Sequence, residues 1–299
     1  MADYNILASE DAFLGLEEDD AASYDQAKAV IIPFGLEASV SYGGGTEKGP
    51  AAILKASHQV ELFDEDLWCE PYKNYGVVTL ECAADNKTDI PSELDRLEKI
   101  VGSVLDDGKF PLVLGGEHSL TAGSIRPFVK KYDELVVLHF DAHADLRDGY
   151  EGEHYSHAAA LRRVMDFENV KLYSFGIRNI SAGEIPFLEA NGHRVKIYWA
   201  KDKAAWNFDE IISHFKGKTV YLTFDLDGFD SSVMPATGTP EPGGLFWDDV
   251  IPIIKEVAKE SKIVGADVVE LAPMENLHAS DFLAAKLCYK ILSYSLNQK

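Results

Sequence analysis

The chain has 299 residues, 46% of them hydrophobic, which is enough to bury a substantial core in one large α/β domain. It carries 28 Lys and Arg against 50 Asp and Glu, and the resulting formal charge of −22 argues against nucleic acid or an anionic membrane surface as a partner. Such acidity would favour small cationic partners, although solubility or habitat is the simpler explanation, since whole-protein charge says little about a site.

Neither disulfides nor membrane insertion is expected. The cysteines lie far apart without a CxxC pair, so they read as reduced thiols: Cys69, Cys82 and Cys288. The first 20 residues are acidic and lack the basic and apolar regions of a secretory signal. No apolar run reaches the ~18 to 20 residues that a membrane span needs. A cytoplasmic location is therefore expected.

Apolar runs typical of buried strands alternate with helical patterns along the chain. Residues 1–25 look loosely attached, as termini often are, and 26–299 are expected to form a single domain. The expected strands are 29–35, 110–116, 134–143, 170–178, 194–200, 219–227 and 262–271. The expected helices are 51–57, which begins just behind Pro50, then 92–108, with Ser92 as candidate N-cap, 248–260 and 280–296.

This alternation of strands and helices defines the expected fold class. Near-continuous apolar strands are typical of a mainly parallel sheet that is covered by helices on both faces. We therefore predict a three-layer α/β/α domain. Ligands of such folds bind beyond the carboxyl ends of the strands, so the chemistry is sought there.

Six potential metal ligands stand at the ends of three of these strands: His118, Asp141, His143, Asp145, Asp225 and Asp227. In an extended chain, residues two apart project to the same face, so the members of each group should share a direction. Together, buried carboxylates without a metal would repel and raise one another's pKa. Four carboxylates and two imidazoles are enough to hold two divalent cations, and we predict such a site.

Taken singly, these residues carry little weight. A histidine after a strand is more often a cap or a core residue, and a lone DxD is usually a turn. Their conjunction on one sheet favours a metal site, and a donor set without thiolate suits Mn²⁺, with Co²⁺, Ni²⁺ or Zn²⁺ as alternatives. His139 shares the parity of Asp141 but lies deeper in the apolar run, so it is expected to be a core histidine or a support for the ligands.

At these positions the sequence resembles the ureohydrolases, the family that contains arginase and agmatinase. Three segments resemble the metal-binding signatures of that family: GGEHS at 115–119, DAHADLR at 141–147 and FDLDGFDSSVMPATGTPEPGGL at 224–245. The segments SYGGGTEKGPAAI, GIR at 176–178 and DVVELAP at 267–273 also resemble the family in order. The resemblance implies the arginase-type fold, two Mn²⁺ per subunit, and a homo-oligomer, either trimer or hexamer.

The resemblance also assigns the ligands. One ion would be held by His118, Asp141, Asp145 and Asp225, and the other by Asp141, His143, Asp225 and Asp227. Asp141 and Asp225 would then bridge both ions. Asp230 does not match a ligand and is expected to be structural or to support the ligands from outside.

Three further roles follow from the resemblance. Glu270 matches the carboxylate that receives the substrate guanidinium, although a capping or surface glutamate is the alternative. His157 aligns with a histidine that shuttles protons or orients substrate, and His154 is its rival. Asp145 or His157 would relay a proton to the leaving amine.

The substrate is expected to be a small cationic guanidino compound. Arg147 and Ser181 stand where arginases carry an asparagine and an aspartate that contact the α-amino acid end. The resemblance therefore favours the agmatinase branch, which splits agmatine into putrescine and urea. A cation at Arg147 leaves open a carboxylate-ended substrate such as guanidinobutyrate.

Other activities remain open at this point. Within the family they are guanidinobutyrase, guanidinopropionase, arginase and formiminoglutamase. A zinc amidohydrolase resembling a deacetylase would need fewer acidic ligands than the chain offers. A catalytically silent scaffold would not need all six ligands together with Glu270.

Overall fold

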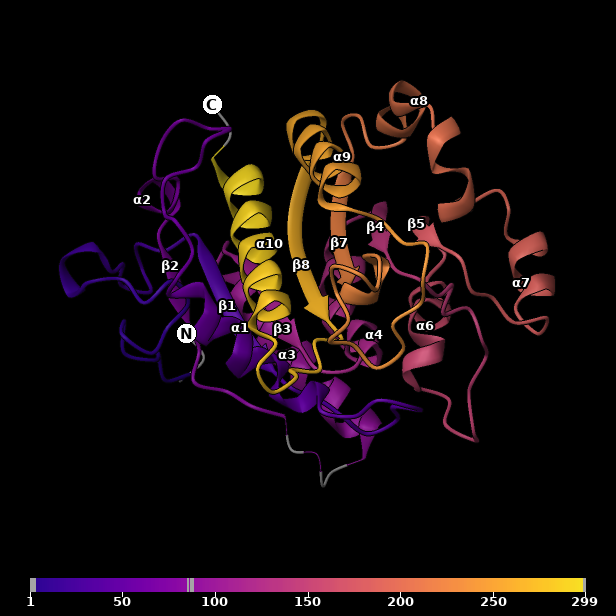
Figure 1. The fold of residues 1–299 in the computed structure, drawn as a ribbon, viewed down its shortest axis with the longest axis horizontal. Helices are drawn as coiled ribbons and strands as arrows, with labels where there is room; N and C mark the ends of the chain where they lie inside the picture. The colour runs from indigo at the N-terminus through magenta and orange to yellow at the C-terminus, as the bar shows by residue number, and fades with distance from the viewer. Residues whose placement is uncertain (1–3, 85, 87–88, 298–299) are drawn as a thin grey trace.

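The computed structural model describes residues 4–84, 86 and 89–297. Its strands form one parallel sheet of eight, in the order β2-β1-β3-β8-β7-β4-β5-β6 (Figure 1). The strands are β1 Ala29–Phe34, β2 Val77–Thr79, β3 Phe110–Gly115, β4 Leu135–Phe140, β5 Val170–Ile177, β6 Val195–Trp199, β7 Thr219–Asp225 and β8 Lys262–Val269.

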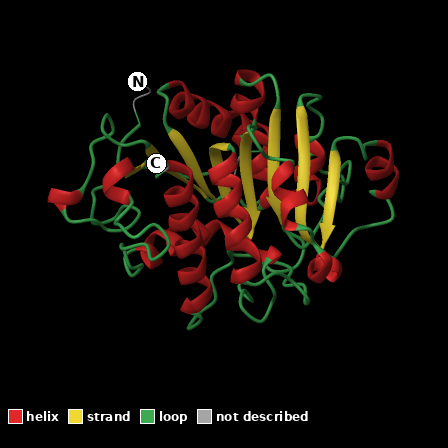
Figure 2. Ribbon diagram, turned by 90° about the horizontal axis from the view of Figure 1, so that it is seen from above, coloured by secondary structure: helices red, strands yellow, loops and turns green. Residues whose placement is uncertain are grey.

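Helices cover both faces of this sheet (Figure 2). The α-helices are α1 Gly49–Ser57, α2 Tyr72–Tyr75, α3 Ile90–Asp106, α4 Thr121–Ser124, α5 Arg126–Lys131, α6 Ala160–Val164, α7 Ile185–Ala190, α8 Phe208–Ser213, α9 Trp247–Glu260 and α10 His278–Leu296. Short 3₁₀ turns include η3 His118–Leu120, η4 His157–Ala159 and η6 Leu226–Gly228.

The alternation along β1 shows how the layers form. Ala29 and Ile31 belong to the core that includes α1, α9 and α10, whereas Val30 and Ile32 belong to the core on the α3 side. All four side chains are fully buried, because successive residues of a strand point to opposite faces and both faces are covered. The predicted three-layer α/β/α fold is confirmed.

Two local expectations need correction. Strand β2 was not expected, because a run of three residues is too short to be recognised from its pattern. The predicted N-cap at Ser92 is wrong: α3 begins at Ile90, and the N-cap is Asp89, whose side chain accepts a hydrogen bond from the Ser92 N–H at 3.1 Å. Pro91 fits inside the first turn, where its missing N–H costs no helical hydrogen bond.

The segment before β1 packs onto the domain. The Phe13 N–H donates to Thr79 Oγ1 at 2.9 Å, the Leu14 N–H donates to Ser57 Oγ at 2.8 Å, and both apolar side chains are buried. Loose attachment therefore does not describe this part of the segment, because its apolar side chains reach the core. The division of the chain at residue 25 and the single domain from residue 26 remain predictions.

Two exclusions made from composition can be compared with the structure. The three cysteines are free thiols. Among the residues described, no helix combines the length and the apolar character that a membrane crossing requires.

A buried ion pair joins α10 to the loop before α2. Lys290 is 1% exposed, and its Nζ lies 3.0 Å from Asp64 Oδ2, 3.0 Å from Glu65 Oε1 and 3.3 Å from Asp66 Oδ2. Asp64 is also fully buried. Removing the ammonium would leave that carboxylate without its counter-charge in the interior.

We predict that Lys290→Ala lowers the free energy of unfolding by about 3 kcal/mol, because an unpaired buried charge is costly. Denaturant titration measures the change. Lys259→Ala is the matched control, since Lys259 is 66% exposed and pairs with Glu256 at the surface. Its effect should stay within about 0.5 kcal/mol. Equal effects of the two substitutions would contradict the prediction.

Candidate active site

Four neighbouring strands end at one cavity. Strands β3, β8, β7 and β4 are adjacent in the sheet, and the polar segments that follow them come together at its carboxyl edge. The cavity has a volume of about 180 Å³. Of the residues singled out from sequence, those that line it are His118, His143, Asp145, Arg147, His157, Ser181, Asp225, Asp227 and Glu270. Asp141 is fully buried and does not line it.

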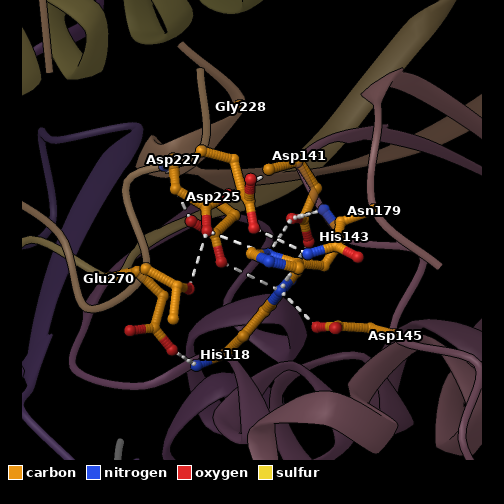
Figure 3. Close-up of polar contacts among 12 residues, drawn as sticks. His118, Asp141, His143, Asp145, Asn179, Asp225, Asp227, Gly228 and Glu270 are labelled. Carbon is orange, nitrogen blue, oxygen red and sulfur yellow. Dashed lines mark hydrogen bonds and ion pairs between the residues drawn. The ribbon is translucent and has the colours of Figure 1, made fainter. Parts of the chain in front are cut away.

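The first group of ligands surrounds the His118 ring (Figure 3). Its Nδ1 lies 3.1 Å from Asp141 Oδ2, 3.1 Å from Asp145 Oδ2 and 3.4 Å from Asp225 Oδ2. These four residues are the set expected for one ion. They converge from three different strand ends, as the sequence predicts.

The tautomer of the neutral ring is set by its other nitrogen. Thr223 Oγ1 donates to Asp267 Oδ1 at 2.6 Å, so it must accept from His118 Nε2–H at 2.9 Å. Nδ1 of the neutral ring is then a buried lone pair; burial lowers the pKa of His118, but the three carboxylates outweigh it and raise that pKa well above its usual range, so Nδ1 needs either a proton or a metal ion. A lone pair facing three carboxylate oxygens is repelled by them unless a cation lies between. This arrangement fits a metal ion.

The second group surrounds His143. Its Nδ1 lies 3.0 Å from Asp227 Oδ2 and 3.6 Å from Asp141 Oδ1. The ligand atoms of His143, Asp141 and Asp227 lie within 4.8 Å of one another, close enough to hold one ion. Asp225 is next to this group, since its Oδ1 accepts from the Asp227 N–H at 2.9 Å.

Loop geometry brings these residues together. Strand β4 ends at Phe140, so the alternation expected through Asp141, His143 and Asp145 does not continue as a strand. Instead the Asp141 carboxylate accepts the His143 N–H at 2.6 Å, and Asp145 takes the left-handed conformation at φ 51°. The residues converge for a different reason from the one predicted.

A close approach of two loops completes the arrangement. Asp227 Oδ1 accepts the Ala142 N–H at 3.0 Å, which joins η6 to the segment after β4. A Cβ at Gly228 would lie 2.8 Å from the Asp141 nitrogen, so only glycine permits this contact. The Arg178 guanidinium adds hydrogen bonds to the backbone oxygens of Asp227 and Glu241, each at 2.7 Å.

The shifted pKa values of the clustered carboxyl groups indicate that they need positive charge nearby. Burial, followed by the charges of Asp227 and Asp141, raises the pKa of Asp225 well above its usual range. Burial also acts to raise the pKa of Asp141, but hydrogen bonds from His118, His139 and His143 outweigh it and hold that pKa well below the usual range. The carboxylates therefore need cations, either protons or metal ions, to remain together.

Two residues support the ligands from beneath. His139 is fully buried, and its ring contacts Asp141 Oδ2 through Nε2 and Ser174 Oγ through Nδ1, each at 2.9 Å. Asp267 holds Thr223 as described. His139 was expected in such a place, whereas Asp267 was missed. A carboxylate inside an apolar strand, three residues before Glu270, was the available signal.

Glu270 directs one oxygen toward the protein and leaves the other for the cavity. Its Oε1 accepts the His118 N–H at 2.7 Å, while Oε2 makes no hydrogen bond to the described part of the chain and lies near Gly238 in the cavity wall. Its φ of 67° is unusual for a side chain of this size, and such strain is concentrated at functional sites. Burial, followed by the charge of Glu117, raises the pKa of Glu270 well above its usual range.

The two rival histidines lie in different surroundings. His157 lines the cavity, and its Nδ1 lies 3.2 Å from Ser39 Oγ. His154 is not among the lining residues and contacts the Arg163 guanidinium instead. Of the two histidines, His157 is therefore the one that lines the cavity.

The contacts of Arg147, Ser181 and Asp230 are also defined by the structure. The Arg147 guanidinium lies over the Tyr150 ring, 5.1 Å from its centroid, at the cavity. Ser181 Oγ donates to Glu184 Oε2 at 2.7 Å. Asp230 lies outside the cavity lining and accepts hydrogen bonds from the Gly243 and Gly244 N–H groups at 2.8 and 2.9 Å, in keeping with a structural role.

The fold and this site together define the class of protein, an α/β enzyme with an acidic, histidine-containing cavity at the carboxyl edge of its central strands. The sequence model of the Arginase family matches residues 27–293. The chain belongs to the arginase family. The resemblance seen in the sequence is thereby confirmed.

Individual relatives support this placement. The chain is 35% identical to an N(1)-aminopropylagmatine ureohydrolase of Synechocystis over 93% of this chain and 92% of that protein. It is 35% identical to an agmatinase of Bacillus anthracis over 84% of this chain and 86% of that one. Among solved structures, the agmatine ureohydrolase of Thermoplasma volcanium superposes with a TM-score of 0.81 at 30% identity, covering 95% of this chain and 94% of that one.

The Thr223 hydroxyl generates a test of the candidate centre. We predict that Thr223→Val lowers metal affinity by roughly 10- to 100-fold, because the His118 ring loses the acceptor that fixes its tautomer. Metal titration of the folded protein measures the affinity.

Thr219→Val is the matched control, since it makes the same replacement at the opposite end of β7. Its metal affinity should equal that of the unchanged protein. If both variants bind metal equally well, Thr223 does not orient a ligand.

Proposed function

We propose that this protein is a binuclear metal-dependent ureohydrolase that splits agmatine into putrescine and urea. One observation carries the proposal: the buried His118 Nδ1 faces three carboxylate oxygens at 3.1 to 3.4 Å, beside a second histidine and carboxylate group. Relatives named agmatinase and agmatine ureohydrolase support agmatine as the substrate. Hydrolysis of a guanidino compound is the activity that this family placement supports.

A second candidate substrate has its own support. The relative that covers 93% of this chain is named for N(1)-aminopropylagmatine, which carries one further amine. Both substrates contain the same guanidinium and would use the same metal centre. They differ only in the tail that would reach the mouth of the cavity.

The metal assignment follows from the donor set. One ion would be held by His118, Asp141, Asp145 and Asp225, and the other by Asp141, His143, Asp225 and Asp227. We propose Mn²⁺ for both, since hard carboxylates with imidazoles and without thiolate suit it, and Co²⁺, Ni²⁺ and Zn²⁺ are the alternatives. When bound, two divalent cations supply Lewis acidity, which makes a nucleophile available from water at neutral pH.

The side chains of the cavity would position the substrate. A guanidinium is cationic at any working pH, and its resonance makes the central carbon a poor electrophile. Glu270 Oε2 would accept a charge-assisted hydrogen bond from it and hold that carbon in place. The raised pKa of the free carboxyl falls when a cation is bound beside it, so the substrate itself favours the charged form.

Proton transfer would complete the reaction. The attacking water would contribute hydroxide to the carbon and give its other proton to His157 Nε2 or to Asp145. As the carbon to nitrogen bond breaks, its electron pair passes to the departing amine, which takes that proton. The hydroxyl on the carbon loses its proton as the carbonyl of urea forms, so the cationic substrate and water give urea and the amine in its protonated form.

The substrate tail and the biological setting belong to the same proposal. Arg147 and Ser181 lack the contacts to an α-amino acid end, which favours agmatine over arginine. A homo-oligomer of three or six subunits and a cytoplasmic location remain predictions from the resemblance and the composition.

The substrate assignment is tested with the Mn²⁺-loaded protein. We expect agmatine or its aminopropyl derivative to give a kcat/KM at least about tenfold above those of arginine and guanidinobutyrate, since a single lost polar contact can cost that much. Urea release measures all four. A higher value for arginine would overturn the branch assignment, and a higher value for guanidinobutyrate would show that Arg147 selects an anionic tail.

The role of Glu270 is tested by Glu270→Gln, which preserves shape and the acceptor for the His118 N–H. Loss of a charge-assisted contact worth about 1.5 to 3 kcal/mol should lower kcat/KM by at least tenfold. Bound metal and melting temperature should change little.

Glu275→Gln, on the exposed loop five residues later, is the matched control and should behave like the unchanged protein. If Glu270→Gln instead lowers the melting temperature and leaves kcat/KM intact, Glu270 is structural.

A further inference from the structure

Glu117 is a fully buried carboxylate that none of the roles above uses. Its Oε2 accepts the N–H groups of Ala38 and Ser39 at 2.7 and 2.6 Å. Its Oε1 accepts the hydroxyls of Ser39 and Ser119 at 2.8 and 2.5 Å. Within the described chain four donors surround this side chain, so both of its carboxylate oxygens act as acceptors.

Ser39 joins this carboxylate to His157. The Ser39 hydroxyl has one proton, which it donates to Glu117 Oε1, so its remaining capacity is to accept. It accepts the His157 backbone N–H at 2.9 Å and lies 3.2 Å from His157 Nδ1. The second contact is a hydrogen bond only if Nδ1 carries a proton.

The proton on Nδ1 determines the tautomer of the neutral His157 ring. With Nδ1 protonated, the neutral imidazole has its lone pair at Nε2. In the described part of the chain Nε2 has no hydrogen-bond partner, and the residue lines the cavity. The nitrogen available to substrate is therefore the one that can accept a proton and, once protonated, donate it.

We propose that Glu117, acting through the Ser39 hydroxyl, is a positioning residue that fixes the orientation and tautomer of His157. The assignment rests on the proposed function, because it gives His157 the proton-transfer part. Glu117 does not touch the substrate.

A purely structural role for Glu117 makes a different prediction. The same hydrogen bonds attach the loop at 38–39 to the segment after β3, so their loss could change stability alone. The two roles are separated by the ionisation of His157, which loop attachment would not alter.

Other charges act on His157 as well. The titratable and charged residues that line the same cavity are His118, His143, Asp145, Arg147, Tyr150, Glu184, Asp225, Asp227 and Glu270. The Tyr150 ring packs against His157 edge to face, 6.1 Å between centroids. A change confined to the Ser39 hydroxyl leaves all of these in place, so any shift can be assigned to the hydroxyl.

The experiment compares single hydroxyl changes in the Mn²⁺-loaded protein. Ser39→Ala removes the bridge and Ser39→Thr keeps a hydroxyl. Ser156→Ala removes a buried hydroxyl that is adjacent to His157 in sequence and makes no hydrogen bond within the described chain. Two quantities are measured: kcat for agmatine, and the rate at which diethylpyrocarbonate modifies His157, followed by peptide mass spectrometry across the pH range in which histidine titrates.

We expect Ser39→Ala to lower kcat by at least about tenfold, with a smaller change in KM and unchanged bound metal, because an acid or base is misplaced and the substrate contacts remain. The modification of His157 should follow a different pH dependence from that in the unchanged protein. Ser39→Thr should restore both quantities, and Ser156→Ala should match the unchanged protein. Glu117→Gln should change the pH dependence of the modification in the same direction as Ser39→Ala. The Glu117→Gln/Ser39→Ala double variant should lose little more activity than Ser39→Ala, since both substitutions act along one path.

The outcomes are distinguishable. If His157 in Ser39→Ala is modified with the same pH dependence as in Ser156→Ala, the positioning role is overturned, whatever the activity. An unchanged kcat in Ser39→Ala would also overturn it. If the unchanged protein releases urea from no guanidino compound, the proposed function fails, and the modification profile alone then decides whether Glu117 and Ser39 control the ring.

Discussion

Repulsion among buried carboxylates is the constraint on which this structure depends. Asp141, Asp145, Asp225 and Asp227 are all at most 7% exposed, and three of them direct an oxygen at one imidazole nitrogen. Such a cluster is costly in a low-dielectric interior unless cations neutralise it. The cluster is therefore suited to binding metal ions, and its surroundings hold the carboxylates together.

The sheet supports the ligands rigidly, whereas the loops determine where each ligand lies. The four central strands place their carboxyl ends side by side, but the ligands themselves lie just beyond those ends. There, unusual conformations are held by hydrogen bonds: Asp145 and Glu270 both have positive φ, and the Glu270 N–H donates to the Gly116 carbonyl at 2.7 Å. Strain of this kind persists only where the surroundings enforce it.

Hydrogen bonds also determine which nitrogen each histidine presents. Asp267 acts through Thr223 on His118, and Glu117 contacts His157 through Ser39. In both cases a hydroxyl donates its single proton to a buried carboxylate and therefore accepts a hydrogen bond from the imidazole. Asp267 and Glu117 thus influence which nitrogen of His118 faces the carboxylates and which nitrogen of His157 faces the cavity. Each acts through a hydroxyl group. The fold and the chemistry are coupled through these hydroxyls.

The sequence by itself determined the layers of the fold and the residues of the candidate centre. Apolar runs indicate buried strands, and the polar residues that directly follow these runs indicate the carboxyl edge of the sheet, where ligands bind. It did not show the N-cap at Asp89, the short strand β2, or the parts played by Glu117 and Asp267. Only the tertiary structure decided those, together with which nitrogen of His118 and which of the two candidate histidines faces the cavity. The physical reason is distance along the chain: Ser39 and His157 are 118 residues apart, and Thr223 and His118 are 105 apart, so no local pattern records contacts that form only when the sheet brings its loops together.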